Sequence, residues 1–445
     1  MTLGQIAYFA VFAATIFGIL VVRRLARPAP IAWWKSALIV AGCIGLALIA
    51  FRISDPPRYF EDFRIAYYPA GRAALKNPDM LRALMGMGVS GFVNLPAVAY
   101  LFAPLAMLPM PAAMALFTAI GVAAIAAAWF LLARLAALDL AGRWLLALLF
   151  VANGPLQYSL KEGNLSHFIL LALAGGLALL RAGRPAAAGA LLGAAAIIKP
   201  PLLLFALFFG LRRDARGFSG FAAICIAAVA ASLVLFGLSD NLRWFEICVL
   251  QFSHRWLAAF NVQSIPAFLF RLQAAPALLR DWNSYAPPDG ASPMAQILVA
   301  GLFAVAGLAA RNGALRPAAG NAEGTQLTLQ YLLVLCLAVV ASPLSWSHYY
   351  CWLLLPTAFF LGQRSHGPSA RIGGWAAILL VTPLVRPLAL SGAWAITTYK
   401  DFAVSHLLFG GLLWFALVAW QLGNPVPSAS RPGFGAVLPR PAGGD

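Results

Sequence analysis

The hydrophobic pattern of the chain consists of long apolar runs separated by short polar segments, many of which carry arginine. About 20 apolar residues suffice to cross a bilayer as a helix. The pattern predicts about 12–14 membrane spans, several of them short, within an all-α polytopic membrane protein. The predicted spans are Gly4–Val22, Trp33–Phe51, Pro111–Ala133, Arg143–Leu160, Leu165–Leu180, Pro185–Ile198, Pro201–Leu211, Phe218–Leu238, Ser292–Ala310, Gln326–Ser342, His348–Gln363, Ile372–Val385 and Phe402–Gln421.

One apolar segment, Leu95–Pro109, does not fit this series. It is only long enough for a buried or re-entrant helix. Counting it as a span would also place the basic loops that follow it on the wrong side of the membrane. We therefore expect a broken helix at the outer surface.

Two polar segments are too long to be simple turns, and both are expected on the outer side: residues 52–95 and 239–290. Loops of this length usually carry function or small helices. The expected cytoplasmic loops are brief, so the chemistry should lie outside. Residues 1–423 are expected to form one transmembrane domain, and the Pro/Gly-rich residues 424–445 a disordered cytoplasmic tail.

Composition supports a membrane protein. Hydrophobic residues make up 62% of the chain and charged residues 10%, whereas soluble domains carry about 25% charged residues. The net charge of +17 is explained by arginine in short cytoplasmic loops, so nucleic acid is not expected as a partner. Gly4–Val22 has no basic residue before it, which indicates a retained helix rather than a cleaved signal peptide.

The five cysteines include no Cys-x-x-Cys pair and most lie in or beside apolar runs. This pattern argues against a disulfide framework and against a zinc site. No metal and no cofactor is expected.

Asp62 is the first candidate for chemistry, because it follows the second predicted span by only about ten residues. A carboxylate at the water–lipid boundary is partly desolvated, which raises its pKa and makes it a usable general base. Sugar transfer to a hydroxyl group needs such a base. The alternative is a surface carboxylate paired with Arg58 or Arg64.

Two further candidates interrupt apolar runs. Glu162 and Asn164 lie in a polar turn, where Asn164 could equally be a helix N-cap. Lys199 precedes two prolines at a break in an apolar run. A lysine there is costly, which favours a functional role such as binding a phosphate. The alternative is a lysine that snorkels to the outer interface.

The later outer segments hold the remaining candidates. Asn261, Gln263 and Ser264 offer amides and a hydroxyl suited to sugar hydroxyls, or else an N-cap before an interfacial helix. Trp346 and His348 combine a flat aromatic ring with an imidazole, or else belong to an interfacial aromatic belt. In one topology all the polar candidates fall on one membrane face: Asp62, Glu162, Asn164, Lys199, Asn261, Gln263, Ser345 and His348.

Taken together, these motifs resemble glycosyltransferase family 87. The resemblance runs from about Asp62 to Pro356. It rests on the following segments: Asp62-Phe63 with Tyr67-Tyr68 and Ala70-Gly71-Arg72-Ala73, Leu95-Pro96 with Leu101–Leu105 and Leu108-Pro109, Glu162-Gly163-Asn164, Arg181 with Gly183-Arg184-Pro185 and Lys199-Pro200, Asn261 with Gln263-Ser264, and Ser342-Pro343 with Ser345-Trp346 and His348. The family commonly has Gly-Gln-x-Asn where this chain has Glu162–Leu165, so the register of that turn differs.

The resemblance implies the GT-C fold, a multi-helix membrane enzyme whose active site faces outward. It implies an inverting transfer of a sugar, mannose or another hexose, from a polyprenyl-phosphate donor to a lipid or glycan acceptor at the periplasmic face of a bacterial inner membrane. It implies that Asp62 is the general base and that Lys199 and His348 lie near the donor phosphate. Further substrate-binding residues are expected at Asn164, Asn261, Gln263, Ser264, Trp346 and Arg72.

The main alternative is a transporter or flippase of a lipid-linked saccharide. Such a protein should carry ionisable groups near the middle of the membrane, on broken helices in two related halves. The chain shows almost no charge within its predicted spans and no paired halves. A polysaccharide polymerase or ligase should show a larger outer loop with several arginines. In a non-catalytic scaffold, the polar clusters on the outer side would have no role.

Overall fold

The computed structural model describes residues 59–314, 322–363, 367–383 and 392–424. Within these ranges the regular elements are helices, together with two isolated β-bridges. The predicted all-α class is therefore confirmed. The predicted spans Gly4–Val22 and Trp33–Phe51 and almost all of the predicted tail lie outside the described residues.

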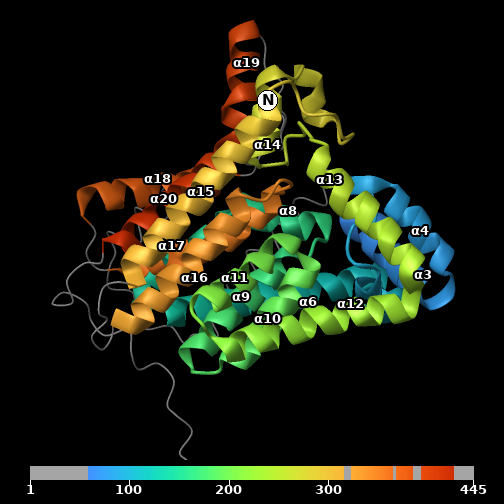
Figure 1. Cartoon of the computed structure of the whole chain (residues 1–445), viewed down its shortest axis with the longest axis horizontal. Helices are drawn as coiled ribbons and strands as arrows, with labels where there is room; N and C mark the ends of the chain where they lie inside the picture. Colours follow the sequence, from blue (N-terminus) through green and yellow to red (C-terminus); the bar gives the residue numbers. More distant parts are fainter. Residues whose placement is uncertain (1–58, 315–321, 364–366, 384–391, 425–445) are drawn as a thin grey trace, which may run out of the picture.

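The helices, in chain order, have the following bounds (Figure 1): π-helix η2 Phe63–Tyr67, α3 Tyr68–Lys76, α4 Pro78–Gly86, 3-10 helix η3 Gly88–Ser90, 3-10 helix η4 Pro96–Phe102, α5 Ala103–Ala106, α6 Met110–Leu135, α7 Leu140–Ala152, α8 Gly154–Glu162, α9 Ser166–Arg181, α10 Pro185–Ile198, 3-10 helix η5 Pro200–Leu203, α11 Leu204–Leu211, α12 Ala215–Trp244, π-helix η6 Phe245–Leu250, α13 Gln251–His254, α14 Ile265–Gln273, 3-10 helix η7 Pro276–Arg280, α15 Ala291–Ala314, α16 Ala322–Val340, 3-10 helix η8 Ser347–Leu353, α17 Leu354–Gly362, α18 Pro368–Val381, α19 Ala393–Asp401, 3-10 helix η9 Ala403–Ser405 and α20 His406–Gly423.

Four helical stretches of the described chain are long and apolar enough to cross a membrane: Met110–Leu135, Ala215–Leu250, Ala291–Asn312 and Ala395–Gly423. Several shorter apolar helices accompany them, including α9, α10 and α18. This set of helices is that of a multi-pass membrane protein.

Two predicted spans are divided in the structure. The sequence predicts one helix over Arg143–Leu160, but α7 ends before Asn153 and α8 begins after it. Asn153 is extended, and its side chain accepts a 2.9 Å hydrogen bond from the backbone N–H of Leu156 as the N-cap of α8. Pro155, which lacks an N–H, suits the first turn of α8. Similarly, His348–Gln363 begins as the 3-10 helix η8 and becomes α-helical only in α17.

The segment Leu95–Pro109 is a short broken helix, as the sequence predicts. It runs as η4 and then as the four-residue helix α5. Helix α3 packs directly against it, because a Cβ on Gly71 would lie only 2.6 Å from the carbonyl oxygen of Phe102. This contact fixes α3 against the short helices of residues 95–109.

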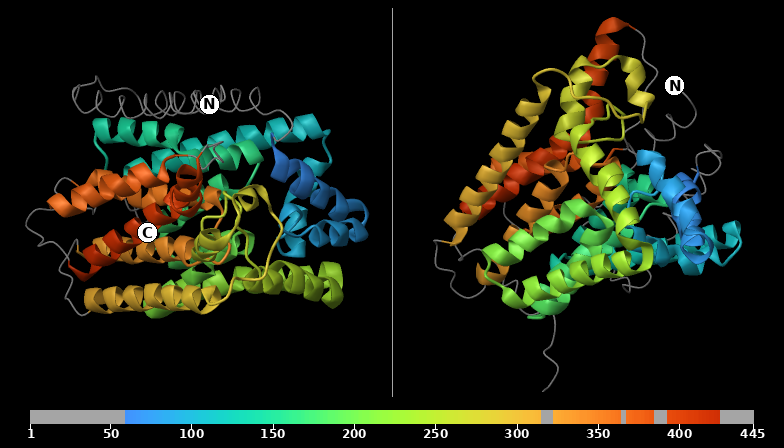
Figure 2. Two further views of the ribbon diagram at one scale, coloured as in Figure 1. Left: turned by 90° about the horizontal axis from the view of Figure 1, so that it is seen from above. Right: turned by 45° about the vertical axis from the view of Figure 1, so that its right-hand side comes forward.

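Many of the helices fall into two groups (Figure 1). Helix α10 crosses α12 at close range, since a Cβ on Gly189 would lie 1.9 Å from the carbonyl oxygen of Gly217. Such small-residue contacts are typical of helix pairs in membranes. Helices α15, α16, α18 and α20 form a second group, whereas α3 and α4 lie at one side of the bundle in both views of Figure 2.

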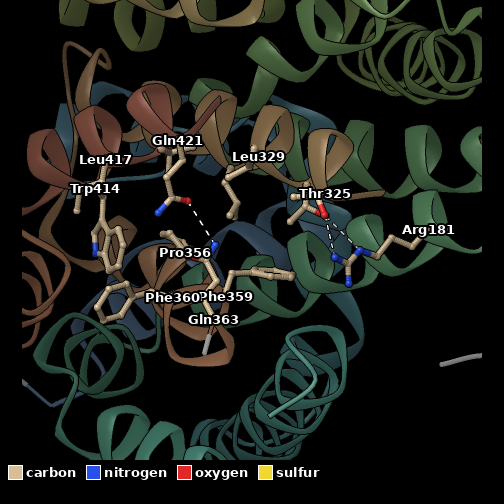
Figure 3. A pocket seen from close by; sticks show the side chains of 13 residues that line it. Arg181, Thr325, Leu329, Pro356, Phe359, Phe360, Gln363, Trp414, Leu417 and Gln421 are labelled. Atoms are coloured by element: carbon tan, nitrogen blue, oxygen red, sulfur yellow. Dashed lines mark hydrogen bonds between the residues drawn. The ribbon is translucent and has the colours of Figure 1, made fainter. Parts of the chain in front are cut away.

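A small cavity lies among the ends of α9, α16, α17 and α20 (Figure 3). Arg181 at its rim donates to the carbonyl of Leu135 at 2.6 Å and to Thr328 Oγ1 at 2.9 Å, so it joins three helices. Arg181 is the last residue of α9, whereas Asn164 lies just before its first. Sixteen helical residues extend about 24 Å. The cavity is therefore far from the polar residues described next.

Candidate active site

Asp62 and Asn164 are in direct contact. Nδ2 of Asn164 donates to Oδ2 of Asp62 at 2.6 Å and to the Tyr67 hydroxyl at 3.3 Å. Oδ1 of Asn164 accepts from both the backbone N–H and the hydroxyl of Ser166, at 3.1 and 3.0 Å. These bonds leave one orientation for the amide, with its NH₂ group facing the carboxylate.

The backbone around Asp62 is held against the turn that carries Asn164. The N–H of Phe60 donates to the carbonyl of Lys161 at 2.7 Å. Gly163 ends α8 in the left-handed conformation, with φ of 67°. A Cβ at Gly163 would lie 2.7 Å from Cβ of Phe63. Glycine is therefore needed both for the turn and for the close approach of the two segments.

The Asp62 carboxyl is partly shielded from solvent. The side chain is half-buried. Burial raises the pKa of the Asp62 carboxyl above its ordinary value, whereas the Asn164 hydrogen bond and the charges of Lys199 and Lys161 act in the opposite direction. The charge of Glu61 adds to the rise. Arg64, one of the two alternative partners, donates to the carbonyl of Tyr59, and Arg58 lies outside the described residues.

Lys199 is a buried cation close enough to Asp62 for their charges to interact. It follows the last residue of α10, just before the two prolines that end that helix. Its Nζ lies 5.0 Å from the centre of the Tyr349 ring, a cation–π contact. Burial lowers the pKa of Lys199 to about 8, and the charge of Asp62 partly offsets this. No carboxylate in the described part of the chain lies within salt-bridge distance of its ammonium.

His348 is buried among aromatic rings. Its ring is nearly parallel to those of Trp346 and Tyr158, each at 6.3 Å between centroids, and it meets Tyr349 edge-on at 5.1 Å. Neither ring nitrogen has a hydrogen-bond partner among the residues that the structure describes. The imidazole therefore retains a donor and an acceptor for a ligand.

Asn261 links the segment between α13 and α14 to these rings. Its Nδ2 donates to the Tyr158 hydroxyl at 3.2 Å, and its Oδ1 accepts from Nε1 of Trp282 at 3.0 Å. Its backbone carbonyl accepts from the N–H of Ser347 at 2.7 Å. Residues from three distant parts of the sequence thus meet beside His348.

Three predicted site residues are placed differently from the others. Arg72 is exposed on α3. Nε2 of Gln263 donates to the carbonyls of Phe260 and Val404, at 2.9 and 2.7 Å, so the side chain joins the segment before α14 to η9, just before α20. Ser264 Oγ accepts from the N–H of Ala267 as the N-cap of α14. The N-cap alternative is therefore the correct one for Ser264.

Some residues of the candidate site are not predicted by the sequence as part of it. Tyr158 falls in the interior of a predicted single span, and Trp282 falls in the second outer segment without a motif around it. Lys161 lies in the same turn as the candidates Glu162 and Asn164, but it is not itself predicted as part of the site. Neither aromatic residue has a local sequence signal, because each acquires its role from a partner far along the chain.

The comparison with known families agrees with the resemblance seen in the sequence. The model of glycosyltransferase family 87 matches residues 92–343, more than half of the chain. No curated protein and no solved structure matches significantly. The matched range contains Asn164, Lys199 and Asn261, whereas Asp62, Trp346 and His348 lie outside it. This multi-pass, all-helical chain therefore belongs to glycosyltransferase family 87, a family of sugar-transferring enzymes.

Proposed function

We propose that the chain transfers a hexose, mannose being the first candidate, from a polyprenyl-phosphate donor to a hydroxyl group of a lipid or glycan acceptor. The reaction inverts the anomeric centre, with Asp62 as general base. The observation that carries this proposal is the Asp62–Asn164 contact, which presents a partly desolvated carboxylate beside the buried ammonium of Lys199.

The role of Asp62 follows from its surroundings. A base that removes a hydroxyl proton works best when its pKa is raised toward the pH of the reaction. Burial provides that rise. The Asn164 amide holds one carboxylate oxygen, so that the other remains available to the acceptor hydroxyl. The hydroxyl oxygen attacks the anomeric carbon on the face opposite the phosphate, the bond to phosphate breaks, and Asp62 receives the proton.

Lys199 is assigned to the donor phosphate. Its ammonium is buried and contacts an aromatic face, an arrangement in which an anionic ligand is the natural partner. A lipid phosphate carries less negative charge at the leaving group than a nucleotide diphosphate, so a single cation supplies much of the required stabilisation. A bound phosphate also favours the protonated form of Lys199.

The sugar ring is assigned to the aromatic group around His348. Flat aromatic faces and amides are suited to the apolar faces and the hydroxyls of a sugar. Trp346 is only half-buried, His348 has free ring nitrogens within the described chain, and Asn261 lies on the neighbouring loop. The three residues thus offer both kinds of contact.

The proposed side of the membrane follows from helix direction. Asn164 and Lys199 lie at the ends of α9 and α10, and the opposite ends of the same helices carry Arg181 and Arg184. Because arginine collects in cytoplasmic loops, the site should face away from the cytoplasm. We infer a periplasmic site in a bacterial inner membrane.

The test is a transfer assay with purified full-length protein in lipid nanodiscs. Polyprenyl-phosphate-mannose, polyprenyl-phosphate-glucose and nucleotide-activated hexoses are offered separately, with a membrane lipid extract as acceptor. We expect release of polyprenyl phosphate, a glycosylated product of inverted anomeric configuration, and no reaction with Asp62→Asn. Turnover of a nucleotide sugar alone, or full activity of Asp62→Asn, would overturn the proposal.

A further inference from the structure

The last two residues of α8, Lys161 and Glu162, form a buried ion pair that the mechanism above does not use. Nζ of Lys161 lies 2.8 Å from Oε1 of Glu162, and the two side chains are only 11% and 7% exposed. Removing one partner of a buried pair leaves the other charge without compensation, so a substitution of one partner alone usually lowers stability.

The pair is adjacent to Asp62 through both the backbone and the charges. The carbonyl of Lys161 accepts from the N–H of Phe60, two residues before Asp62. Burial raises the pKa of Glu162 to about 7, the charges of Asp62 and Glu61 add to the rise, and Lys161 acts in the opposite direction. The charged groups that act on Asp62 are Lys199, Glu61 and Lys161, with Asn164 as its neutral hydrogen-bond partner. Tyr158 also faces the pair, with its ring 5.7 Å from Nζ of Lys161.

Lys161 pairs with Glu162 and not with Asp62. Its ammonium is bonded to the Glu162 carboxylate, and its charge also lowers the pKa of Asp62. A direct ion pair with a cation typically lowers a carboxyl pKa by about 1–3 units. A carboxylate bonded to Lys161 would thus be a poorer base than one bonded only to the neutral amide of Asn164.

We propose that Glu162 is a positioning residue: it binds the ammonium of Lys161 and thereby prevents a direct ion pair between Lys161 and Asp62. Asp62 then stays basic, and Lys199 remains the cation that faces the donor phosphate. This inference rests on the proposed role of Asp62 as general base, but the ionic arrangement can be tested without any substrate.

The test measures the protonation of Asp62 chemically. Dicyclohexylcarbodiimide modifies protonated carboxyl groups in apolar surroundings, and peptide mapping by mass spectrometry reports the labelling of Asp62 separately from that of Glu162. Labelling is followed against pH in the full-length wild type, Glu162→Gln, Lys161→Met and the double variant. The acid side of the kcat/KM profile is measured in parallel.

The two single variants should shift in opposite directions. In Glu162→Gln, Lys161 is released toward Asp62 and a neighbouring negative charge is lost, so Asp62 should label less at fixed pH, by about threefold or more. In Lys161→Met, a cation that lowers the pKa of Asp62 is lost, so labelling should increase. The double variant should lie between the two. A purely structural effect on the turn gives no reason for opposite signs.

The chain offers a matched control. Lys400 and Asp401 are also adjacent in sequence and form a buried pair at 2.9 Å, with side chains 10% and 14% exposed, at the end of α19. Lys400→Met should leave the labelling of Asp62 unchanged. Shifts of equal sign in the two site variants, or none beyond that of Lys400→Met, would overturn the inference while leaving the proposed function intact. A wild type that labels as expected but transfers no sugar would instead overturn the proposed function.

Discussion

The amide of Asn164 donates a 2.6 Å hydrogen bond to the carboxylate of Asp62, although the two residues lie 102 positions apart in the sequence. The bond joins the residue before η2 to the turn after α8. It combines a group able to accept a proton with a group that fixes its direction, and the buried cation Lys199 lies close by.

Replacing Asp62 with asparagine should abolish sugar transfer. The substitution preserves size and removes only the proton acceptor, so we expect a loss of about 10²–10⁴-fold in kcat with normal insertion and folding. Asp289→Asn is the matched control, because Asp289 is an exposed aspartate of the second outer segment. Product formation by Asp62→Asn at the rate of this control would exclude Asp62 as the base.

The kcat/KM of the wild type should fall at both low and high pH. Asp62 must be ionised, so kcat/KM should fall as the pH drops through its pKa, which burial raises above the ordinary value. Lys199 must be protonated, and its pKa is lowered to about 8, so the rate should also fall as the pH rises past that value. A profile that stays flat well above pH 8 would contradict the role of Lys199.

Asn164→Ala should move the acid side of this profile to higher pH. The Asn164 hydrogen bond favours the ionised carboxylate, so its removal should raise the pKa of Asp62 further, and kcat should fall because the carboxylate is no longer oriented. Asn153→Ala is the control, since Asn153 is equally buried but caps α8. It should lower stability by about 1 kcal/mol without moving the acid side of the profile.

Lys199→Met should weaken catalysis with the lipid-phosphate donor. Loss of a charge that stabilises the leaving phosphate should reduce kcat/KM by about 10²-fold, and the fall in rate above pH 8 should disappear. Lys76→Met removes an exposed lysine of the first outer segment and should have little effect. Equal donor kinetics in the two variants would show that Lys199 does not meet the phosphate.

Gly163→Ala should separate Asp62 from Asn164. The new Cβ would meet the side chains of Phe63 and Phe60 at 2.7 and 2.9 Å. Gly183→Ala provides the comparison, because Gly183 has a similar φ of 70° but nothing within 4 Å of its Cβ position. Both should lose about 1 kcal/mol from backbone strain, and Gly163→Ala should lose a further 1–3 kcal/mol or so from the clash, with much lower transfer activity. Thermal unfolding in detergent and the transfer assay measure both effects.

Most of the described helices could be predicted from the apolar pattern. Predicted spans such as Pro111–Ala133 and Pro185–Ile198 correspond closely to α6 and α10. The pattern also identified Leu95–Pro109 as a broken helix. It failed where one apolar run contains two helices, as at Asn153, because lipid and a protein core accept the same residues and only capping chemistry marks the break.

Only part of the candidate site could be predicted from the sequence. Asp62, Asn164 and Lys199 were identified because polar groups are costly beside apolar runs, and the structure brings them together. Arg72 was selected with them, yet it is exposed on α3. Gln263 was selected as a sugar-binding amide, yet its side chain bonds to η9, just before α20. Residue type alone could not separate these cases, because an amide can bond a ligand or a backbone carbonyl equally well.

The apolar pattern alone is enough to predict a helical membrane protein, because the length and composition of apolar runs decide which segments lipid can solvate. It also determined which few polar residues would be costly to bury. The partners of these residues depend on how the helices pack: Asn164 bonds to Asp62, and Glu162 pairs with Lys161. The ammonium of Lys199 contacts the Tyr349 ring and has no carboxylate partner among the described residues. The physical reason is that hydrogen bonds and ion pairs act over a few ångströms, and helix packing sets which distant residues come within that range.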